Sequence, residues 1–284
     1  MRTFTCPVHG DTFTDEGLPS FVKNCFCPRC LEEEPDHLDH ERQYREAYRR
    51  WWYWQRYSGV PARGRNRTIA NWHPQGRGQQ LIHKAVTQYA LRIRDHLQQG
   101  SGLTLLGPPG VGKTHLGYGL LAASFNAGVQ GIYAVWPDVL DRHKATFSDR
   151  GSSDRQLLED LKSIRFLVLD EIGVRSGSEF DQALLFDLID SRYRHELPTV
   201  VISNLTEATL DSIGERTADR LREMNTLAPI PGESQRVNAA SNRDLIDAPP
   251  AVREPERPTV EHRVCINGEM VTRTWQPSPP DNLR

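Results

Sequence analysis

The sequence lacks any run of about 18 consecutive apolar residues, the length that a membrane-spanning helix needs. The stretch from Met1 to Gly10 also lacks the apolar segment that a secretory signal places after its positive charge. The formal net charge is only −2, which excludes a protein that coats nucleic acid through a uniformly basic surface. We therefore expect a cytoplasmic protein with no membrane partner, in which any basic surface is local.

Cysteine is scarce outside one short region, because four of the five cysteines lie among the first thirty residues. This distribution indicates a metal site in a reducing compartment rather than a disulfide framework. Cys6-x-x-His9 and Cys27-x-x-Cys30 form two chelating pairs that suit one tetrahedral Zn²⁺. Cys25 is an alternative ligand to Cys27, although its spacing to Cys30 fits less well. A segment of about thirty residues is too short to bury a stable core alone. We therefore expect zinc to fold it.

Four stretches of the chain differ in composition, and no internal repeat is visible. A Cys/His-rich start is followed by an aromatic and Arg-rich helix with a linker, an α/β core and a Pro-rich tail. The expected boundaries of these stretches are 1–31, 32–73, 74–247 and 248–284. We predict that the tail is extended or disordered, with a small hairpin from Val264 to Trp275 as the alternative.

The second stretch combines positive charge with aromatic side chains. From Arg42 to Arg67 there are many arginines and one acidic residue, Glu46. The interleaved aromatic residues are Tyr44, Tyr48, Trp51, Trp52, Tyr53, Trp54 and Tyr57. A helix that is aromatic on several sides is poorly suited to water and should pack on something. Three surfaces qualify: a partner protein, a nucleic acid, or this protein's own zinc segment or core.

The third stretch alternates short apolar runs with helical patterns. The runs that read as strands are Gly102–Leu106, Gly131–Trp136, Ile164–Leu169 and Thr199–Ser203. Between the last two runs, apolar residues recur at helical spacing, at Leu184, Leu185, Leu188, Ile189 and Tyr193. This order predicts an α/β fold with a parallel sheet and helices on both of its faces.

A G-x-x-x-x-G-K-T pattern directly follows the first predicted strand and opens a predicted helix. It comprises Gly107, Pro108, Pro109, Gly110, Val111, Gly112, Lys113 and Thr114. Glycines in this position let backbone N–H groups turn toward a phosphate. We expect Lys113 to reach the β- and γ-phosphates of ATP, and the Thr114 hydroxyl to ligate Mg²⁺. A glycine-rich turn without a ligand would not need Lys and Thr at the helix start.

A second motif supplies the acidic groups that metal-assisted hydrolysis needs. The apolar run Phe166–Leu169 predicts a buried strand, so Asp170 and Glu171 emerge at its carboxyl end, beside the phosphate loop. We expect Asp170 to hold Mg²⁺ through water and Glu171 to activate the attacking water, the alternative being a polar strand end. Asn204 ends the next strand at the same edge. It either orients that water or forms a plain turn.

These residues resemble the AAA+ ATPases and, among them, the DnaC-type replicative helicase loaders, which are related to the IstB transposition helper ATPases and the DnaA initiator. The resemblance runs from about Val60 to Arg243. Besides the phosphate loop, it rests on Gly59 to Arg63, His115-Leu116, Leu167 to Gly173, Ser203 to Leu205 and Gly214 to Leu221. It implies an AAA+ fold, an ATPase activity, a DnaB-type helicase partner, binding to single-stranded DNA and self-association into an oligomer.

The resemblance also implies roles for residues around the nucleotide. Arg220 corresponds to the arginine finger that reaches the γ-phosphate of the neighbouring subunit. Arg216, one helical turn away, is its rival, and an ordinary solvated helix arginine is the plain alternative. His115 and Arg243 take positions that contact the nucleotide, although the sequence around Arg243 departs from the family pattern.

For DNA, the segment from Ser176 to Phe180 resembles the loop with which the family binds single strands, with Ser178 and Phe180 as the contact residues. An aromatic ring in such a loop can stack on an unpaired base. Phe180 can equally be a helix-start residue packed against the core. Phe147 is a weaker candidate for the stacking role.

Of the three surfaces considered for the aromatic helix, the resemblance favours a partner protein, because in helicase loaders the region before the ATPase domain binds the helicase. We therefore expect an ATP-dependent loader of a ring helicase onto single-stranded DNA. The alternative is an IstB-like ATPase that helps a transposase to select target DNA, which binding to duplex DNA would favour. A binding module with a vestigial ATPase is a third reading. It is disfavoured by the presence of Lys113, Thr114, Asp170 and Glu171.

Overall fold

The computed structural model describes residues 3–14, 27, 29–30, 37–145, 153–174, 178–234 and 248–277. Contacts divide the chain into two units. The larger is Arg50–Arg253, and the smaller combines Met1–Arg49 with Glu254–Arg284. Among the described residues, no helix has the length and apolar character needed to cross a membrane. The smaller unit thus brings together both ends of the sequence, which the compositional boundaries did not predict.

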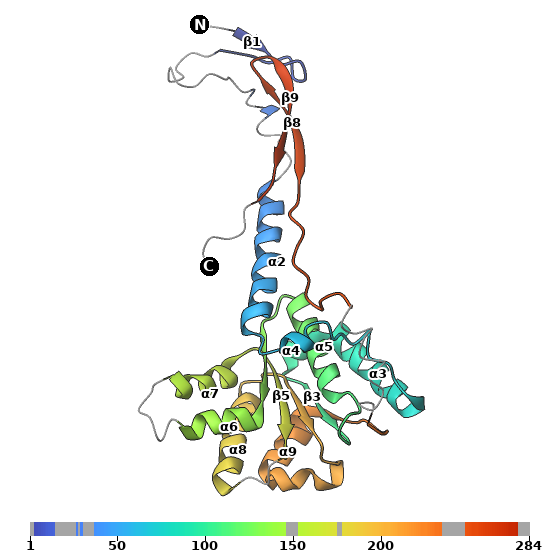
Figure 1. Cartoon of the computed structure of the whole chain (residues 1–284). Helices are drawn as coiled ribbons and strands as arrows, with labels where there is room; N and C mark the ends of the chain where they lie inside the picture. Colours follow the sequence, from blue (N-terminus) through green and yellow to red (C-terminus); the bar gives the residue numbers. More distant parts are fainter. Residues whose placement is uncertain are drawn as a thin grey trace. The chain divides into compact units, whose positions relative to one another are not determined.

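The larger unit is built on a five-stranded parallel sheet with the order β4-β5-β6-β3-β7 (Figure 1). The strands are β3 (Gly102–Leu106), β4 (Gly131–Val135), β5 (Phe166–Ile172), β6 (Thr199–Ser203) and β7 (Asn225–Pro229). The central strands β3 and β6 are buried along their whole length, as expected for a sheet covered on both faces. The predicted α/β fold with a parallel sheet is confirmed.

Side chains of each strand alternate between two hydrophobic cores on opposite faces of the sheet, because a strand has a two-residue period. Leu105 of β3 and Val168 of β5 belong to one core, whereas their neighbours Leu106 and Leu169 belong to the other. Helices α3 (Gly76–Leu91), α4 (Ile93–Gln99) and α5 (Lys113–Asn126) cover the first core. Helices α6 (Trp136–Ala145), α7 (Ser153–Ser163), α8 (Glu179–Arg194) and α9 (Glu215–Met224) cover the second. The short 3-10 helices are η1 (Ala62–Gly64) and η2 (Glu207–Ile213).

Most expected elements are present, with differences at their ends. β3 and β6 have the predicted bounds, and α8 covers the predicted crossover helix. β4 ends one residue early because Trp136 begins α6, and β5 continues to Ile172. β7 was not predicted, because Asn225 and Pro229 are poor strand formers. Its place beside β3 depends on tertiary pairing that local sequence does not specify.

The aromatic, Arg-rich segment forms helix α2 (His37–Tyr57). Its Trp54 is fully buried in the first core, where its ring meets Phe125 edge-on with centroids 5.4 Å apart. Val60 and Trp72, which follow α2, belong to the same core. Of the three surfaces considered for this helix, one face therefore packs against the protein's own core. That core begins well before the expected boundary at residue 74.

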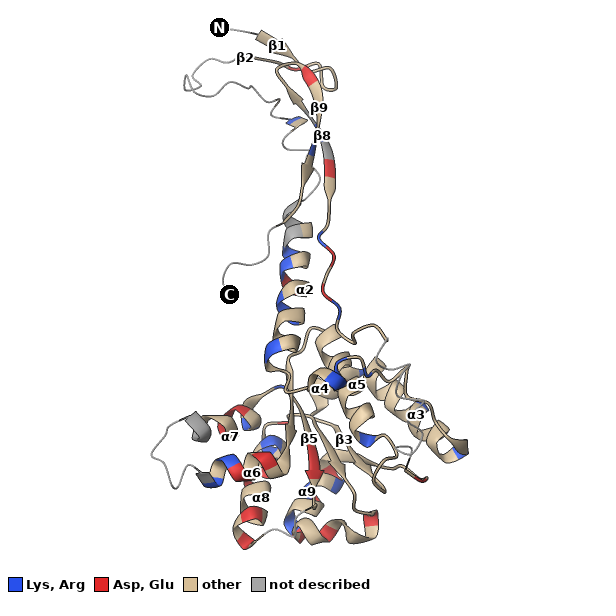
Figure 2. Cartoon of the chain, in the orientation of Figure 1, with Lys and Arg blue, Asp and Glu red and all other residues tan. Residues whose placement is uncertain are grey.

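Other aromatic side chains of α2 lie at the surface of the larger unit. Tyr57 is 56% exposed. The rings of Trp52, Tyr53 and Tyr57 contact one another in edge-on or tilted arrangements, with centroids 5.3 to 5.4 Å apart. The Arg56 guanidinium lies 5.7 Å from the Trp52 ring centre. We name Trp52, Tyr53, Arg56 and Tyr57 the α2 aromatic patch. Figure 2 shows how arginine recurs along this helix.

The smaller unit contains two antiparallel pairs of strands. β1 (Thr3–Thr5) pairs with β2 (Thr12–Thr14), and β8 (Val260–Ile266) pairs with β9 (Glu269–Trp275). The expectation of an extended or disordered tail is therefore corrected for residues 260–275. The hairpin foreseen as an alternative forms and starts earlier than expected. Its turn is Asn267-Gly268, with φ angles of 52° and 85°, the pair that two-residue hairpin turns favour.

Burial of Trp54 predicts its contribution to stability. Trp54→Ala should lower the free energy of unfolding by about 3–5 kcal/mol, because it leaves a cavity beside Phe125. Tyr57→Ala, in the same helix but exposed, should cost less than about 1 kcal/mol. Urea unfolding followed by circular dichroism at 222 nm measures both. Equal losses in the two variants would mean that Trp54 does not anchor α2 in the core.

Candidate nucleotide and metal sites

The phosphate loop joins β3 to α5, so that Gly107 follows the strand and Lys113 is the first helical residue. Gly110 and Gly112 have φ angles of 84° and 93°, which side chains rarely tolerate. A methyl group on Gly112 would also clash with Nε1 of Trp72. The glycines of the motif are therefore required both by the backbone of the loop and by the linker packed beside it.

Lys113 extends back into the loop. Its Nζ donates to the carbonyl oxygens of Gly107 and Pro108 at 2.7 and 2.8 Å, and to Oδ1 of Asn204 at 2.8 Å. Asn204 follows β6, so the ammonium group joins two neighbouring strand ends at the carboxyl edge of the sheet. The structure thus brings together Lys113 and Asn204, both of which the sequence predicted at this edge of the sheet. A cation among backbone groups is suited to bind phosphate oxygens.

The carboxylate of Asp170 is held by three donors at the end of β5. Its Oδ2 accepts from the Thr114 hydroxyl at 2.8 Å and from the Tyr133 hydroxyl at 2.9 Å, and its Oδ1 accepts from the Glu171 amide at 2.7 Å. Burial and the charge of Asp170 raise the pKa of Tyr133, so this hydroxyl remains a donor. Tyr133 on β4 was not found from the sequence, because nothing local marks it.

Thr114 and Asp170 together fit a magnesium ion. Both offer oxygen, the ligand type that Mg²⁺ prefers, and they lie side by side beneath the phosphate loop. Carboxylate and hydroxyl from these positions would hold the ion together with phosphate oxygens and water. The ion would neutralise charge on the phosphates, and Lys113 would bind phosphate oxygens from the loop.

Glu171 has an unusual backbone conformation. Its φ is 61°, and the pairing of β5 with β6 shifts register between Leu169 and Ile172. A side chain in this region costs about 1–3 kcal/mol, and such strain gathers at functional sites. The bulge exposes Glu171 beyond the buried strand, where it lines a pocket of about 100 Å³ together with Trp136 and Gln182. Its expected role as the base that activates water stays a prediction.

His115 lies against the linker before the sheet. Its Nε2 is 2.9 Å from the Thr68 carbonyl oxygen and 2.8 Å from Oδ1 of Asn71, while its Nδ1 is 3.2 Å from a guanidinium nitrogen of Arg67. Burial lowers its pKa to about 4, and the charge of Arg67 acts in the same direction. The neutral ring therefore ties the linker to the phosphate-loop helix. Its expected contact with a nucleotide stays a prediction.

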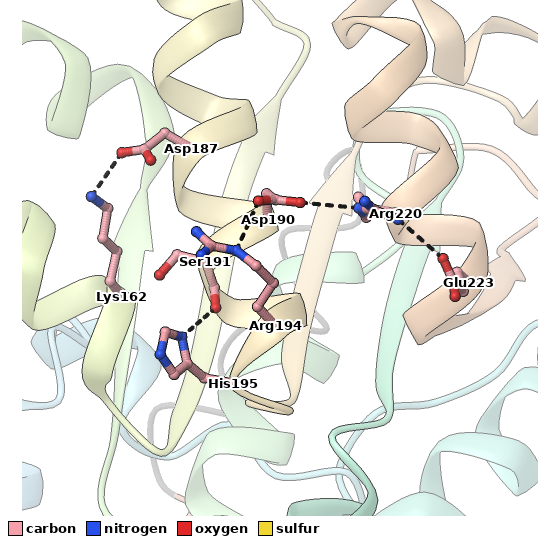
Figure 3. Close-up of polar contacts among 8 residues, drawn as sticks. All are labelled: Lys162, Asp187, Asp190, Ser191, Arg194, His195, Arg220 and Glu223. Carbon is pink, nitrogen blue, oxygen red and sulfur yellow. Dashed lines mark hydrogen bonds and ion pairs between the residues drawn. The ribbon is translucent and has the colours of Figure 1, made fainter.

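Both candidate finger arginines extend from α9 toward α8. Arg220 Nε is 3.1 Å from Oδ1 of Asp190 (Figure 3). Its side chain is 33% exposed, and its guanidinium lies 4.4 Å from the ring centre of Tyr193. The Arg216 guanidinium lies 4.1 Å from the ring centre of Phe186. Asp190, which also pairs with Arg194, was not foreseen as a partner.

Ser178 and Phe180 stand at the start of α8. Ser178 is the helix N-cap, and it forms a reciprocal capping box with Asp181. Phe180 is 43% exposed, and its ring stacks on His143 with centroids 6.1 Å apart. Phe180 is thus a helix-start residue, as one alternative stated, but its ring is only partly packed. Its contact with DNA stays a prediction. The other candidates Cys25, Phe147, Ser176 and Arg243 lie outside the described residues.

The predicted zinc ligands come together in the smaller unit. Ligand atoms of Cys6, His9, Cys27 and Cys30 all lie within 4.8 Å of one another. Four of the pairwise distances are 3.5 to 3.7 Å. Sulfur and nitrogen ligands about 2.0–2.3 Å from a tetrahedral zinc ion are roughly 3.5–3.8 Å apart, so the cluster fits this metal. Although burial opposes ionisation, backbone N–H groups of His9 and Val8 lower the pKa of Cys6 to about 6.

Known proteins place this architecture in a family. A family model described as IstB-like ATP binding protein matches residues 36–242. The replicative helicase loader DnaC of Escherichia coli K12 is 30% identical over 172 residues, 60% of this chain and 69% of that protein. The Buchnera aphidicola (Acyrthosiphon pisum) DnaC is 28% identical over the same length. A crystal structure of the DnaC helicase loader has a TM-score of 0.55 at 27% identity, covering 60% of this chain and all of that one.

A phosphate loop, paired acidic residues and this parallel sheet define an ATPase of the AAA+ class. Within that class, the chain belongs to the family of IstB-like and DnaC ATP-binding proteins. A crystal structure of DnaI, with a TM-score of 0.52 at 18% identity, shares the fold. The family recognised from the sequence is thereby confirmed.

The lowered pKa of His115 predicts a pH dependence of stability. Because the unfolded histidine has a pKa near 6.5 and the folded one about 4, the unfolded state binds more protons between these values. This contribution is complete above pH 6.5 and is lost as the pH falls toward 4. Between pH 7.5 and 5 it should amount to about 2 kcal/mol.

His115→Gln keeps a side-chain donor but does not titrate in this range. Its free energy of unfolding should therefore fall less steeply than that of the wild type between pH 7.5 and 5. Urea unfolding at a series of pH values measures the two slopes. Parallel slopes would show that His115 does not carry the pH dependence.

Proposed function

We propose that this protein loads a ring-shaped replicative helicase of the DnaB type onto single-stranded DNA under the control of ATP. The observation that carries the proposal is the grouping of Lys113, Thr114, Asp170 and Asn204 at one sheet edge, in a chain similar to relatives named replicative helicase loaders. Loading is an event at the chromosome, so the proposal puts the protein in the cytoplasm. Lys113 would bind phosphates, and Asp170 and Thr114 would hold Mg²⁺. Glu171 would activate water that Asn204 orients.

The α2 aromatic patch is our proposed contact for the helicase. Tryptophan, tyrosine and arginine dominate binding hot spots, and the patch combines all three at the surface. Because Trp54 fixes the same helix in the core, the patch is presented from a rigid element. Such a surface loses little conformational entropy when it binds.

For single-stranded DNA we propose the start of α8. The partly exposed ring of Phe180 can stack on an unpaired base. Ser178 caps the N-terminus of α8, two residues before Phe180. DNA bound there would lie close to Glu171, since the pocket that Glu171 lines also contains Asp181 and Gln182 of α8.

A second candidate is assistance to a transposase in the choice of target DNA. The family model carries the name IstB-like, and the phosphate loop serves either activity. The two functions differ in their partner and in the form of DNA bound. We favour helicase loading because the Cys/His cluster and the α2 aromatic patch together suggest a protein-binding region before the ATPase domain.

A loading assay separates these functions. Purified protein is mixed with the host's replicative helicase and closed circular single-stranded DNA coated with binding protein, and release of an annealed strand is measured. We expect unwinding to depend on the protein, and Lys113→Ala to reduce it at least about tenfold because phosphate binding is lost. No stimulation and no helicase binding, together with stimulation of a transposase on duplex DNA, would reverse the choice.

We also propose that the protein acts as an oligomer in which Arg220 completes the nucleotide site of a neighbour. A finger supplied in trans can be removed without damaging its own subunit's phosphate loop. Arg220→Ala alone should bind ATP but hydrolyse it slowly, and Lys113→Ala alone should fail to bind it. Mixed assemblies should regain part of the activity, since some interfaces combine an intact loop with an intact finger.

The mixture is assayed with helicase and single-stranded DNA present, because assembly can require them. Arg216→Ala is the matched control. If Arg220 is the finger, a mixture of Arg216→Ala with Lys113→Ala should hydrolyse no more ATP than the sum of the two separate variants. Hydrolysis that never exceeds the sum of the separate variants, in assemblies shown to be mixed, would place Arg220 in its own subunit. If Arg216→Ala complements Lys113→Ala and Arg220→Ala does not, then Arg216 is the arginine finger.

The third part of the proposal is one zinc ion per chain at Cys6, His9, Cys27 and Cys30. Zinc would fold the short N-terminal segment, whose two-stranded β1–β2 pair has little core. Elemental analysis of protein prepared without chelator should find about one zinc per chain. Cys27→Ser with Cys30→Ser should abolish it, whereas Cys25→Ser should not. Metal-free wild-type protein would refute this part.

A further inference from the structure

The hairpin formed by β8 and β9 lies against the Cys/His cluster, although it comes from the opposite end of the chain. Cys265 on β8 is fully buried and belongs to one hydrophobic cluster with Cys6, Cys27 and Cys30. Met270, which pairs with Cys265 across the hairpin, packs against this cluster. The hairpin thus covers the cluster with an apolar surface.

A backbone hydrogen bond joins the hairpin to the cluster. The Cys27 amide donates to the Cys265 carbonyl oxygen at 3.2 Å. Cys265 and Cys30 also belong to the same buried cluster. Groups just outside a metal's own ligands typically hold those ligands in place.

The turn of the hairpin reaches β1. A methyl group on Gly268 would lie 3.6 Å from the Thr5 carbonyl oxygen and 3.9 Å from Cβ of Phe4. β1 leads directly into Cys6, so the turn contacts the strand that positions the first ligand. The hairpin therefore touches both chelating pairs, one through β1 and the other through Cys27 and Cys30.

The hairpin has little core of its own. Most described side chains of β9 are exposed, and Cys265 is the buried side chain among those described on β8. An isolated two-stranded hairpin is marginally stable at best in water. Its order consequently depends on the surface on which it docks, and that surface combines the Cys/His cluster with β1.

We propose that β8 and β9 form the third limb of the metal module and dock only when the cluster is loaded with metal, so that zinc at the N-terminal residues also fixes the C-terminal end of the chain. This inference rests on the proposed zinc site. Cys265 is not one of its ligands, because the four mutually close ligand atoms come from Cys6, His9, Cys27 and Cys30. It supplies a buried cover over the ligand sulfurs.

The physical reason for this coupling is that metal binding and folding are one event in so small a module. When the metal leaves, the two chelating pairs are no longer held together, and the hairpin loses the surface it covers. Conversely, loss of the cover exposes the ligand sulfurs to water and to competing chelators. Changes just outside the ligands of a metal typically lower metal affinity about 10–100-fold.

Two measurements on the full-length protein test the proposal. Hydrogen exchange of peptides from residues 260–275 is followed before and after zinc is removed with a chelator. Zinc transfer to a chromogenic chelator is timed for the wild type, for Cys265→Ala and for Val271→Ala. Val271 lies on β9 and is 39% exposed, which makes it the matched control.

We expect the hairpin to be protected in the loaded protein and to exchange freely after zinc removal. Cys265→Ala should still bind one zinc but release it about 10–100-fold faster, while Val271→Ala should release it like the wild type. The zinc content of every sample is measured in parallel.

Three results would overturn the inference, and they differ in what else they affect. Zinc-containing protein whose hairpin protection and Cys265→Ala release rate do not change would sink the coupling and leave the zinc site intact. Loss of stoichiometric zinc in Cys265→Ala would make Cys265 a ligand instead of a cover. Wild-type protein without zinc would overturn the proposed zinc site itself and the inference with it.

Discussion

The nucleotide site depends on how Asp170 is held at the end of β5. Its carboxylate accepts from Thr114 on the phosphate-loop helix, from Tyr133 on the neighbouring strand and from the next backbone amide. Three elements that are distant in sequence are thereby fixed around one acidic group. The same edge of the sheet carries Asn204, which holds Lys113. Parallel pairing of β3, β5 and β6 is what brings these strand ends together.

The smaller unit is organised by a different constraint. It has too few apolar side chains for a conventional core, and its buried centre consists of four cysteines with Phe13 and Met270 packed around them. Small modules of this kind need an additional source of stability, which the proposed zinc ion would supply. The larger unit is organised by its buried sheet, and the smaller unit by its Cys/His cluster.

Local pattern predicted the parts of the structure that local physics determines. The phosphate loop needs its glycines for backbone conformation, and a buried apolar run before Asp170 marks a central strand. Both features could therefore be predicted from the sequence. Contacts between residues distant in the sequence could not be predicted in this way. Tyr133 beside Asp170, Asp190 beside Arg220 and Cys265 beside the Cys/His cluster depend on tertiary packing. Trp54 was recognised as needing a partner, but periodicity does not reveal that the partner is Phe125.

The central claim is that ATP binding and ATP hydrolysis are carried by different residues at the same sheet edge. A combined measurement of ATP affinity and single-turnover hydrolysis in Glu171→Gln tests it most directly. We predict wild-type affinity, since Lys113, Thr114 and Asp170 are intact, with hydrolysis slowed at least about 100-fold by loss of the base. Wild-type turnover in this variant, or loss of ATP binding together with hydrolysis, would contradict the account.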